Sequence, residues 1–249
     1  RQMCIRDRNN PKVDAIFGLH AWPGKVGTVE YRSGPTMAAA ERMRITVTGS
    51  QTHGAVPWKG VDPIAISSQI ITALQTIVAR EVNITQVPAV VTIGSIHGGV
   101  RNNIIPEEVV MEGTIRTFND EVRKDIHDSI RKKAEMIASA SGATAKVEIF
   151  SDIAKVTFNE PSLTDKMVPS LERVYGKENV KITPFITGAE DFPFFTDHAP
   201  GLYFFNGVAP DPSKAAPNHS PYFFADERNL KYGTKALTQL AVDYLYLYK

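Results

Sequence analysis

Cysteine is almost absent from this chain, with Cys4 the single example among 249 residues. One thiol excludes an internal disulfide and any zinc site built from several thiolates. An excess of one charge sign is also missing, because 28 Lys and Arg residues balance 27 Asp and Glu residues to a formal net charge of +1. Such a chain has no strong field for nucleic acid or an anionic membrane, so we expect neither as a partner.

Long apolar runs are lacking as well, since none approaches the roughly 20 residues that span a bilayer. The sequence therefore predicts a protein outside the membrane, and the single cysteine favours a reducing compartment, the cytoplasm. The chain begins with Arg1 and shows no signal segment. Residues 1–10 are interpreted as non-native or disordered, because the first of them have neither helical nor strand periodicity.

What is present describes a folded globular protein. Hydrophobic residues make up 43% of the chain and charged residues 22%, which is the balance of a protein with a packed core. A length of 249 residues is enough for two domains of ordinary size. We therefore expect two segments that differ in their pattern of strand and helix signals.

The middle of the chain alternates strand and helix signals. Residues 42–48 alternate in polarity as in a half-buried strand, and Asp62 followed by Pro63 predicts a helix start. A second helix is predicted from about Asp120 to Gly142. Further strands are predicted at residues 88–96, 109–118 and around 147–149. The order β-α-β-β-α-β over residues 42–150 is that of a ferredoxin-like fold, a sheet with both helices on one face.

On either side of residues 42–150 the sequence predicts alternating strands and helices. A strand at residues 14–17 is predicted to end just before His20, and a capping box at Ser162 opens a helix. Strands at residues 180–185 and 201–205 and a terminal helix after Asp226 follow. The fold class is therefore α/β, with the middle segment inserted into, or appended to, an α/β domain.

Two histidines stand in segments that present side chains. His53 lies in the Gly- and Pro-rich stretch 49–63, where it is either a site residue or an ordinary surface histidine. His20 is either a functional residue at a strand end or a core-edge histidine hydrogen-bonded to backbone. Local sequence alone leaves both alternatives open.

Six motifs in a fixed order narrow the choice. They are FGLHAWP at 17–23, THGA at 52–55 with GVDPI at 60–64, NIIP at 103–106, GTIRTF at 113–118, GAEDF at 188–192 and HSPYF at 219–223. Together they resemble the M20 metallopeptidase family, and within it the amidohydrolase branch of hippurate hydrolases, N-acyl-amino-acid amidohydrolases and auxin-conjugate hydrolases.

The resemblance implies an architecture and a reaction. Residues 11–37 and 151–249 correspond to a zinc-peptidase-like α/β catalytic domain that lacks its N-terminal part. Residues 38–150 correspond to an inserted ferredoxin-like lid that also dimerises, so a homodimer is implied. The reaction implied is hydrolysis of the amide bond of a small N-acyl or N-aroyl amino acid, with two divalent metal ions, zinc, manganese or cobalt, as cofactors.

The resemblance also assigns a role to three histidines. His20 and His219 correspond to ligands of the metal pair, which lowers the pKa of a bound water and polarises the scissile carbonyl. His53 corresponds to a lid histidine that hydrogen-bonds the developing oxyanion, commonly in the active site of the partner subunit.

Three further residues correspond to substrate-binding positions. Asn103 and Arg116 match residues that hold the free carboxylate, for which a guanidinium fork is well shaped, and Glu190 belongs to a motif near the metal cleft. The residues themselves leave alternatives. Arg116 shares a strand face with Glu112 and could form a surface ion pair, and Glu190 with Asp191 could cap the following turn.

The chain also departs from the family pattern. The remaining metal ligands and the glutamate base of the family come from a segment upstream of the strand that leads to His20. Cys4 lacks the neighbouring Gly-His-x-x-His pattern, and the pair Glu107-Glu108 lies in the lid. We therefore expect this polypeptide to bind metal weakly and to be an inactive fragment, since three protein ligands are usual for a catalytic zinc. The alternatives are a non-catalytic binding or dimerisation module, or an exopeptidase acting on dipeptides.

Overall fold

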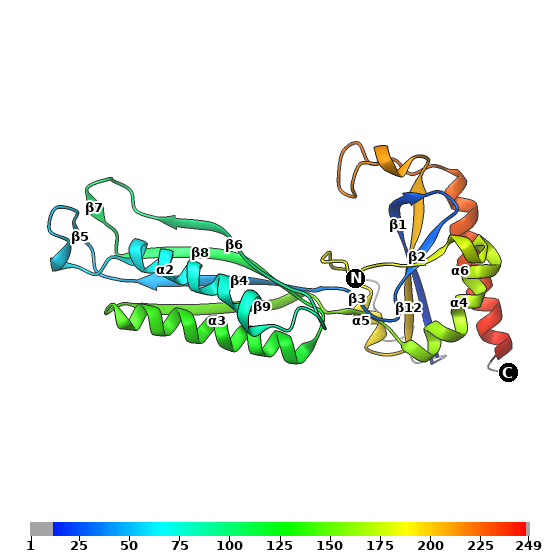
Figure 1. Ribbon diagram of the computed structural model, residues 1–249, viewed down its shortest axis with the longest axis horizontal. Coiled ribbons are helices and arrows are strands. Elements are labelled where there is room, and N and C mark those ends of the chain that lie inside the picture. The colour runs from blue at the N-terminus through cyan, green and yellow to red at the C-terminus, as the bar shows by residue number, and fades with distance from the viewer. Residues whose placement is uncertain (1–11, 248–249) are drawn as a thin grey trace. The chain divides into compact units, whose positions relative to one another are not determined.

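The computed structural model describes residues 12–247, so the interpretation of residues 1–10 lies outside the described residues (Figure 1). The chain divides into two compact units. Unit 1 comprises Arg1–Met37, Thr157–Ile186 and Glu190–Lys249, and unit 2 comprises Ala38–Val156 and Thr187–Ala189. The middle of the chain therefore folds on itself, and the sequence on either side of it joins in one unit.

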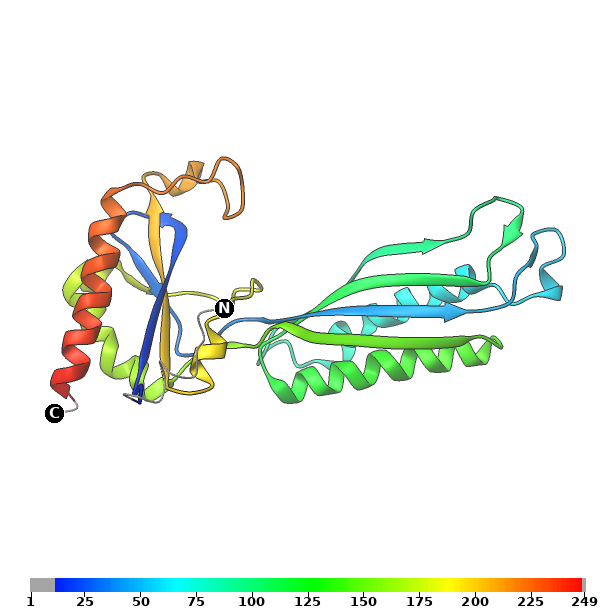
Figure 2. The same cartoon turned by 180° about the vertical axis from the view of Figure 1, so that it is seen from behind.

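Unit 2 is built on a four-stranded antiparallel sheet. Its strands are β4 (Ala39–Thr48), β6 (Ala89–Gly98), β8 (Glu108–Thr117) and β9 (Thr144–Ala154), in the order β6-β8-β4-β9. The helices α2 (Pro63–Thr76) and α3 (Asp120–Ala140) pack on one face of this sheet (Figures 1 and 2). The β-α-β-β-α-β order is the one that the periodicity predicts, and β9 runs past residue 150 to Ala154.

The core of unit 2 follows from the two-residue period of its strands and the 3.6-residue period of its helices. Every second residue of β4 is buried, and the helices contribute stripes at three- and four-residue spacing. The opposite face of β4 carries Arg42 and Arg44, which are exposed. The buried residues of these three elements include Met43, Ile45, Val47, Ile66, Ile70, Leu74, Ile126, Ile130 and Ala134.

The helix starts of unit 2 have side-chain caps. The Asp62 carboxylate accepts hydrogen bonds from the backbone N–H groups of Ile64 and Ala65, at 2.8 and 3.3 Å, as its position before Pro63 predicts. Asn119 caps α3 in the same way. After α2 the chain continues through a π-helical turn, η2 (Ile77–Glu81), which the apolar spacing did not predict.

Unit 1 is a mixed sheet with two long helices. Its strands are β1 (Ile16–Lys25), β2 (Val29–Tyr31), β11 (Val180–Ile182) and β12 (Gly201–Ala209), in the order β1-β12-β2-β11. β1 runs parallel to β12, and β2 runs antiparallel to it. The helices α4 (Pro161–Tyr175) and α6 (Arg228–Leu247) contact each other and the sheet. Their apolar faces share a core with β12 that includes Leu163, Met167, Leu171, Phe204, Ala236 and Leu240.

Two expectations for unit 1 were wrong, and one feature was not predicted. His20 lies in the middle of β1 rather than past its end, because pairing with β12 continues as far as Trp22. The cap of α4 is Glu160, whose carboxylate accepts from the Ser162 and Leu163 N–H groups, so Ser162 does not open the helix. The short pair β3 (Gly34–Met37) and β10 (Thr157–Asn159) was not predicted.

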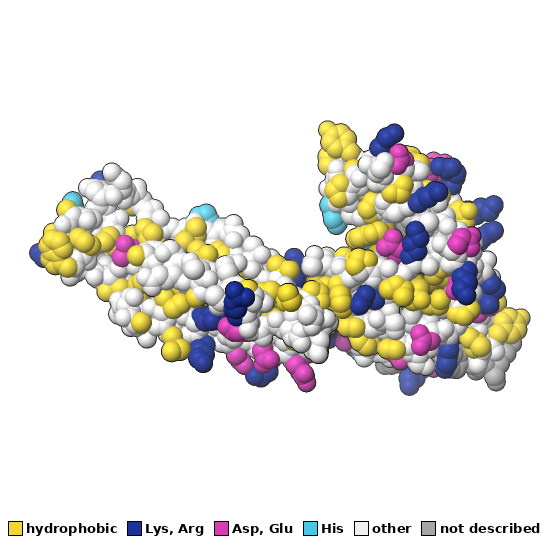
Figure 3. Space-filling view, viewed as in Figure 1, with side chains coloured by type: hydrophobic (Ala, Val, Ile, Leu, Met, Phe, Trp, Pro, Cys, Tyr) yellow, Lys and Arg dark blue, Asp and Glu magenta, His cyan; other side chains and the backbone are white. Residues whose placement is uncertain are grey.

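One face of the molecule shows no strong segregation of charge (Figure 3). On the face drawn in Figure 3, basic and acidic side chains are interspersed, consistent with the balance of the sequence. No helix within residues 12–247 has the length and apolar character needed to cross a bilayer.

Candidate functional site

His20 lies in an apolar part of unit 1. It is paired with Phe205 of β12, and its ring meets those of Trp22, Tyr203 and Phe205 at centroid distances of 5.7, 6.5 and 6.4 Å. Its side chain is 24% exposed. Aromatic rings on several sides limit both the motion of the imidazole and the access of water to it.

The two ring nitrogens of His20 have different partners. Nδ1 lies 2.7 Å from the backbone oxygen of Ala21, and because a carbonyl can only accept, Nδ1 carries a proton and donates it. Nε2 lies 3.2 Å from Oε1 of Glu190. In the neutral ring Nε2 has a lone pair, which is the arrangement found in metal-binding histidines whose other nitrogen donates to a backbone carbonyl.

The contact between His20 and Glu190 suits a shared cation. A carboxylate oxygen and an unprotonated imidazole nitrogen are both acceptors, so a proton or a metal ion must lie between them. Zinc ligands of these two kinds lie about 2.0–2.2 Å from the metal, so neighbouring ligand atoms are roughly 3–3.5 Å apart. The observed 3.2 Å falls in that range.

Glu190 lies near a buried tyrosine. Burial raises the pKa of Tyr203, and the negative charge of Glu190 raises it further. The Tyr203 hydroxyl therefore stays protonated. The capping interpretation of Glu190 and Asp191 is wrong, because the short helix α5 (Pro193–Thr196) begins without a side-chain cap.

His219 stands on a loop with a strained backbone. Its φ of 67° makes it the one non-glycine residue with positive φ among those that the structure describes. It is the third residue of a turn from Pro217 to Ser220, closed by a 3.2 Å backbone hydrogen bond, where a type II turn favours glycine or asparagine. A residue other than glycine in the left-handed region raises the conformational free energy of the backbone by about 1–2 kcal/mol. The backbone at His219 is therefore strained.

The loop is attached to the strand of His20. The Asn218 side-chain amide donates to the Ala21 carbonyl oxygen at 2.9 Å, and this oxygen is the one that accepts from His20 Nδ1. The structure therefore brings the His219 segment, His20 and Glu190 into one region of unit 1. Asn218 and Tyr203 were not predicted as members of this region, although an Asn after a Pro is a common turn residue.

The donor set is appropriate for a divalent metal but incomplete. Imidazole and carboxylate are ligands of zinc, manganese and cobalt. Within residues 12–247, however, no group of three or more His, Cys, Asp or Glu side chains has the arrangement of a metal site. The described part of the chain therefore contains the His20–Glu190 pair of potential ligands and no group of three. Cys4, which the sequence left unassigned, lies outside it.

His53 and Asn103 lie together at one end of unit 2. The short strands β5 (Thr52–His53) and β7 (Ile104–Ile105) pair there, and the N–H of Gly54 donates to the Asn103 carbonyl at 2.8 Å. The Ala55 N–H donates to Nδ1 of His53 at 3.0 Å, so the neutral ring carries its proton on Nε2. This side chain is exposed, which leaves the Nε2–H available as a donor.

Arg116 lies in β8 of the four-stranded sheet, near the end of the strand that is away from Glu108. It pairs with Ala40 on β4, and its eight-residue separation from Glu108 along β8 corresponds to about 26 Å. The surface ion pair that its strand face suggested is not formed with Glu112, because that carboxylate is bound by Arg44 at 2.6 Å. Within unit 2, the structure thus brings His53 and Asn103 together and separates Arg116 from both.

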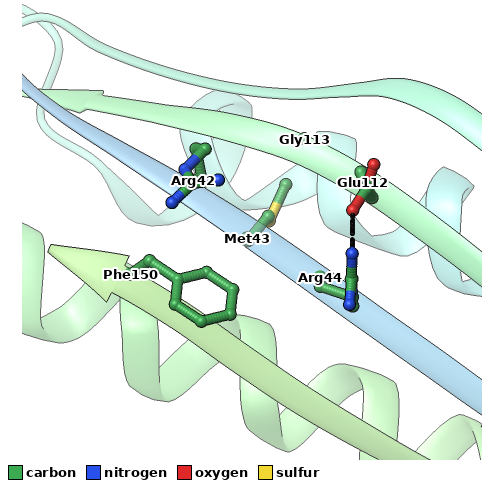
Figure 4. Close-up of a pocket in the computed structure, with 6 residues that line it drawn as sticks. All are labelled: Arg42, Met43, Arg44, Glu112, Gly113 and Phe150. Atoms are coloured by element: carbon green, nitrogen blue, oxygen red, sulfur yellow. Dashed lines mark hydrogen bonds and ion pairs between the residues drawn. The ribbon is translucent and has the colours of Figure 1, made fainter. Parts of the chain in front are cut away.

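A shallow pocket of about 200 Å³ lies on the open face of the unit 2 sheet (Figure 4). Arg44 and Glu112 neutralise each other there, and the guanidinium of Arg42 lies 5.4 Å from the centre of the Phe150 ring. No histidine lines it. We do not assign this pocket to the metal site.

The chain resembles known proteins over almost its whole length. The family model described as peptidase family M20/M25/M40 matches residues 1–243. Thermostable carboxypeptidase 2 of Saccharolobus solfataricus is 38% identical over 236 residues, which are 93% of this chain and 58% of that protein. N-acetyl-L-cysteine deacetylase of Bacillus subtilis is 38% identical over 227 residues, 90% of this chain and 52% of that protein.

Solved structures agree with these similarities. A structure from methicillin-resistant Staphylococcus aureus, described as an aminohydrolase, has a TM-score of 0.87 at 28% identity and covers 97% of this chain and 62% of its own. A dinuclear metal-binding peptidase from Bacillus subtilis has a TM-score of 0.75 at 27% identity, with coverages of 97% and 60%. The chain spans less than two thirds of the length of each of these four proteins.

Proposed function

The chain belongs to peptidase family M20/M25/M40, and we propose that the complete protein is a metal-dependent amidohydrolase. It cleaves the amide bond of an N-acyl or N-aroyl amino acid and releases a carboxylic acid and the amino acid. The observation that carries this proposal is the 3.2 Å contact between His20 Nε2 and Glu190 Oε1. The similarity to a deacetylase of N-acetyl-L-cysteine supports an N-acyl amino acid as substrate.

The residues of unit 1 prepare a metal site. His20 is oriented by its Nδ1–H bond to Ala21, Glu190 lies 3.2 Å from His20 Nε2, and His219 is presented by the strained loop. A bound pair of divalent ions, zinc, manganese or cobalt, supplies activation of a water molecule and polarisation of the amide carbonyl. The aromatic walls around His20 lower the local dielectric and strengthen interactions with developing charge.

Unit 2 serves as a ferredoxin-like lid through which the protein forms a homodimer. Counted along the chain its strands are in the order 4-1-3-2, and both helices lie on one face. His53 donates its Nε2–H to the oxyanion, and Asn103 and Arg116 bind the free carboxylate. Because His53 lies on the separate pair β5-β7 and Arg116 lies near the far end of β8, a small substrate that contacts both takes them from two copies of the chain.

The polypeptide of 249 residues does not catalyse hydrolysis by itself. Among residues 12–247 no group of three or more His, Cys, Asp or Glu side chains has the arrangement of a metal site, and a catalytic zinc usually has three protein ligands. A longer form of the protein supplies the remaining ligands and the general base.

An exopeptidase that acts on dipeptides is the second candidate. The 38% identity to a thermostable carboxypeptidase favours it. Both candidate substrates carry a free carboxylate next to the scissile amide, so the site described above does not distinguish them. A third candidate, a non-catalytic binding or dimerisation module, gains no support from the placement of His20 against Glu190.

The test is a substrate panel with the complete protein. N-acetyl and N-benzoyl amino acids and dipeptides are offered with zinc, manganese or cobalt, and release of the amino acid is measured. We expect hydrolysis of the acyl amino acids, loss of activity in His219→Ala, and little change in His198→Ala, which replaces an exposed histidine of the same unit. Cleavage of dipeptides alone would select the exopeptidase, and full activity of His219→Ala would overturn the metal assignment.

A further inference from the structure

One backbone oxygen connects the two histidines that the proposed function assigns to the metal. The Ala21 carbonyl oxygen accepts from His20 Nδ1 at 2.7 Å and from Asn218 Nδ2 at 2.9 Å. A carbonyl oxygen has two lone pairs and can satisfy both donors. Ala21 and Asn218 are 197 residues apart in sequence, so this oxygen is the point at which β1 and the loop of His219 meet.

The loop of His219 is made of consecutive tight turns. Ser220 N–H donates to the Pro217 carbonyl at 3.2 Å, and Phe223 N–H donates to the Ser220 carbonyl at 3.0 Å. These bonds are internal to the loop and do not fix it to the sheet. The Asn218 side chain supplies the bond to β1, whereas the next attachment along the chain is the Asp226 N–H, which donates to the Val208 carbonyl of β12. Asn218 stands directly before the residue with the left-handed backbone.

We propose that Asn218 is a positioning residue, which fixes His219 relative to His20 through the Ala21 carbonyl. The inference rests on the proposed function only in taking the two histidines as metal ligands. Without the Asn218 amide, the loop loses its bond to β1, and the unfavourable φ of His219 is no longer imposed by a second attachment. The two imidazoles then sample a wider range of separations, which weakens binding of any ion that needs both.

A matched control is present in the same unit. Asn179 Nδ2 donates to the Tyr175 carbonyl at 2.8 Å, so it is also a half-buried asparagine that closes a loop on a backbone oxygen. This bond lies at the end of α4 and involves neither histidine. Asn179→Ala therefore reports the general cost of removing such a bond, and Asn218→Ala reports that cost together with any positioning effect.

The experiment compares the two variants in the complete protein with two readouts. Amide hydrogen exchange of Ser220 and Phe223 is measured without metal, and zinc affinity is measured by calorimetric titration. For Asn218→Ala we expect at least tenfold faster exchange of both amides and a 10- to 100-fold loss of zinc affinity, roughly the range for partners that orient a metal ligand. Asn179→Ala is expected to change neither, and the thermal midpoints of the two variants should be similar.

Three outcomes would decide against parts of this account. Unchanged exchange in Asn218→Ala overturns the attachment itself. Faster exchange with unchanged zinc affinity overturns the positioning role and leaves a loop anchor. If the wild type takes up none of zinc, manganese and cobalt, the proposed function fails, and the exchange data alone decide whether Asn218 holds the loop.

Discussion

His20 Nε2 and Glu190 Oε1 face each other across 3.2 Å in unit 1. The other nitrogen of His20 is already bound to the Ala21 carbonyl. The imidazole is therefore oriented with Nε2 toward the carboxylate, which is the arrangement expected of a histidine prepared as a metal ligand. This relationship makes the metal-site account testable at individual residues.

Glu190→Gln in the complete protein should weaken zinc binding by about 10- to 100-fold, because the amide keeps an oxygen but loses the charge that stabilises the cation. Titration calorimetry measures the change. Asp191→Asn is the control, since it removes the neighbouring exposed carboxylate. Equal affinities of Glu190→Gln and the wild type would show that Glu190 does not bind the ion.

His219→Asn should not destabilise the metal-free protein, because asparagine adopts a positive φ more readily than histidine does. We expect the thermal midpoint to stay the same or to rise by up to about 4 °C. Zinc affinity should fall at the same time. His198→Asn serves as the comparison, and a drop of several degrees in His219→Asn alone would contradict the strain argument.

Glu41 makes the stability of unit 2 depend on pH in the acidic range. Burial would raise the pKa of this carboxyl, which is 1% exposed, but hydrogen bonds from His127, at 2.6 Å, and from Ser151 outweigh burial and lower the pKa below its ordinary 4.5. A lowered folded-state pKa contributes stability above pH 4.5, and this is lost as the pH falls through the folded-state value.

Glu41→Gln should therefore lose about 1–3 kcal/mol at pH 7 and show a smaller decline in acid. Urea unfolding between pH 7 and pH 3 measures both effects. Glu107 is exposed and lies just before β8. The Glu107→Gln variant should have the same free energy of unfolding as the wild type at each pH. A steep acid decline retained in Glu41→Gln would assign the acid sensitivity to other groups.

His53 should act across a dimer. Mixing His53→Ala subunits with His219→Ala subunits of the complete protein should restore part of the activity, because one of the two sites then has both histidines. A mixture of His20→Ala with His219→Ala should recover nothing, since both residues belong to unit 1. No recovery in verified heterodimers would remove the role in trans.

Local sequence predicts elements better than it predicts the site. The strands and helices of unit 2 follow from alternation, from the cap at Asp62 and from apolar stripes, all of which are local signals. The position of His20 within β1 was wrong because its extension depends on pairing with β12, about 180 residues later in the chain. Strand length is set by the partner strand as much as by the segment itself.

The contacts of the site depend on still longer separations. The motifs single out His20, Glu190 and His219 as candidate site residues, but no local pattern predicts that Asn218 binds the oxygen of Ala21. This bond forms only when β1 and the loop of His219 have assembled. The candidate ligands are therefore visible in the sequence, and the contact that we propose to position them is not.

The most direct test of the central claim is an anomalous-diffraction map of the complete protein, recorded at the absorption edge of the metal that supports its activity. The account predicts a peak about 2.0–2.2 Å from His20 Nε2, within bonding reach of Glu190 or His219. A fully active, metal-loaded crystal with no anomalous peak near His20 would contradict it.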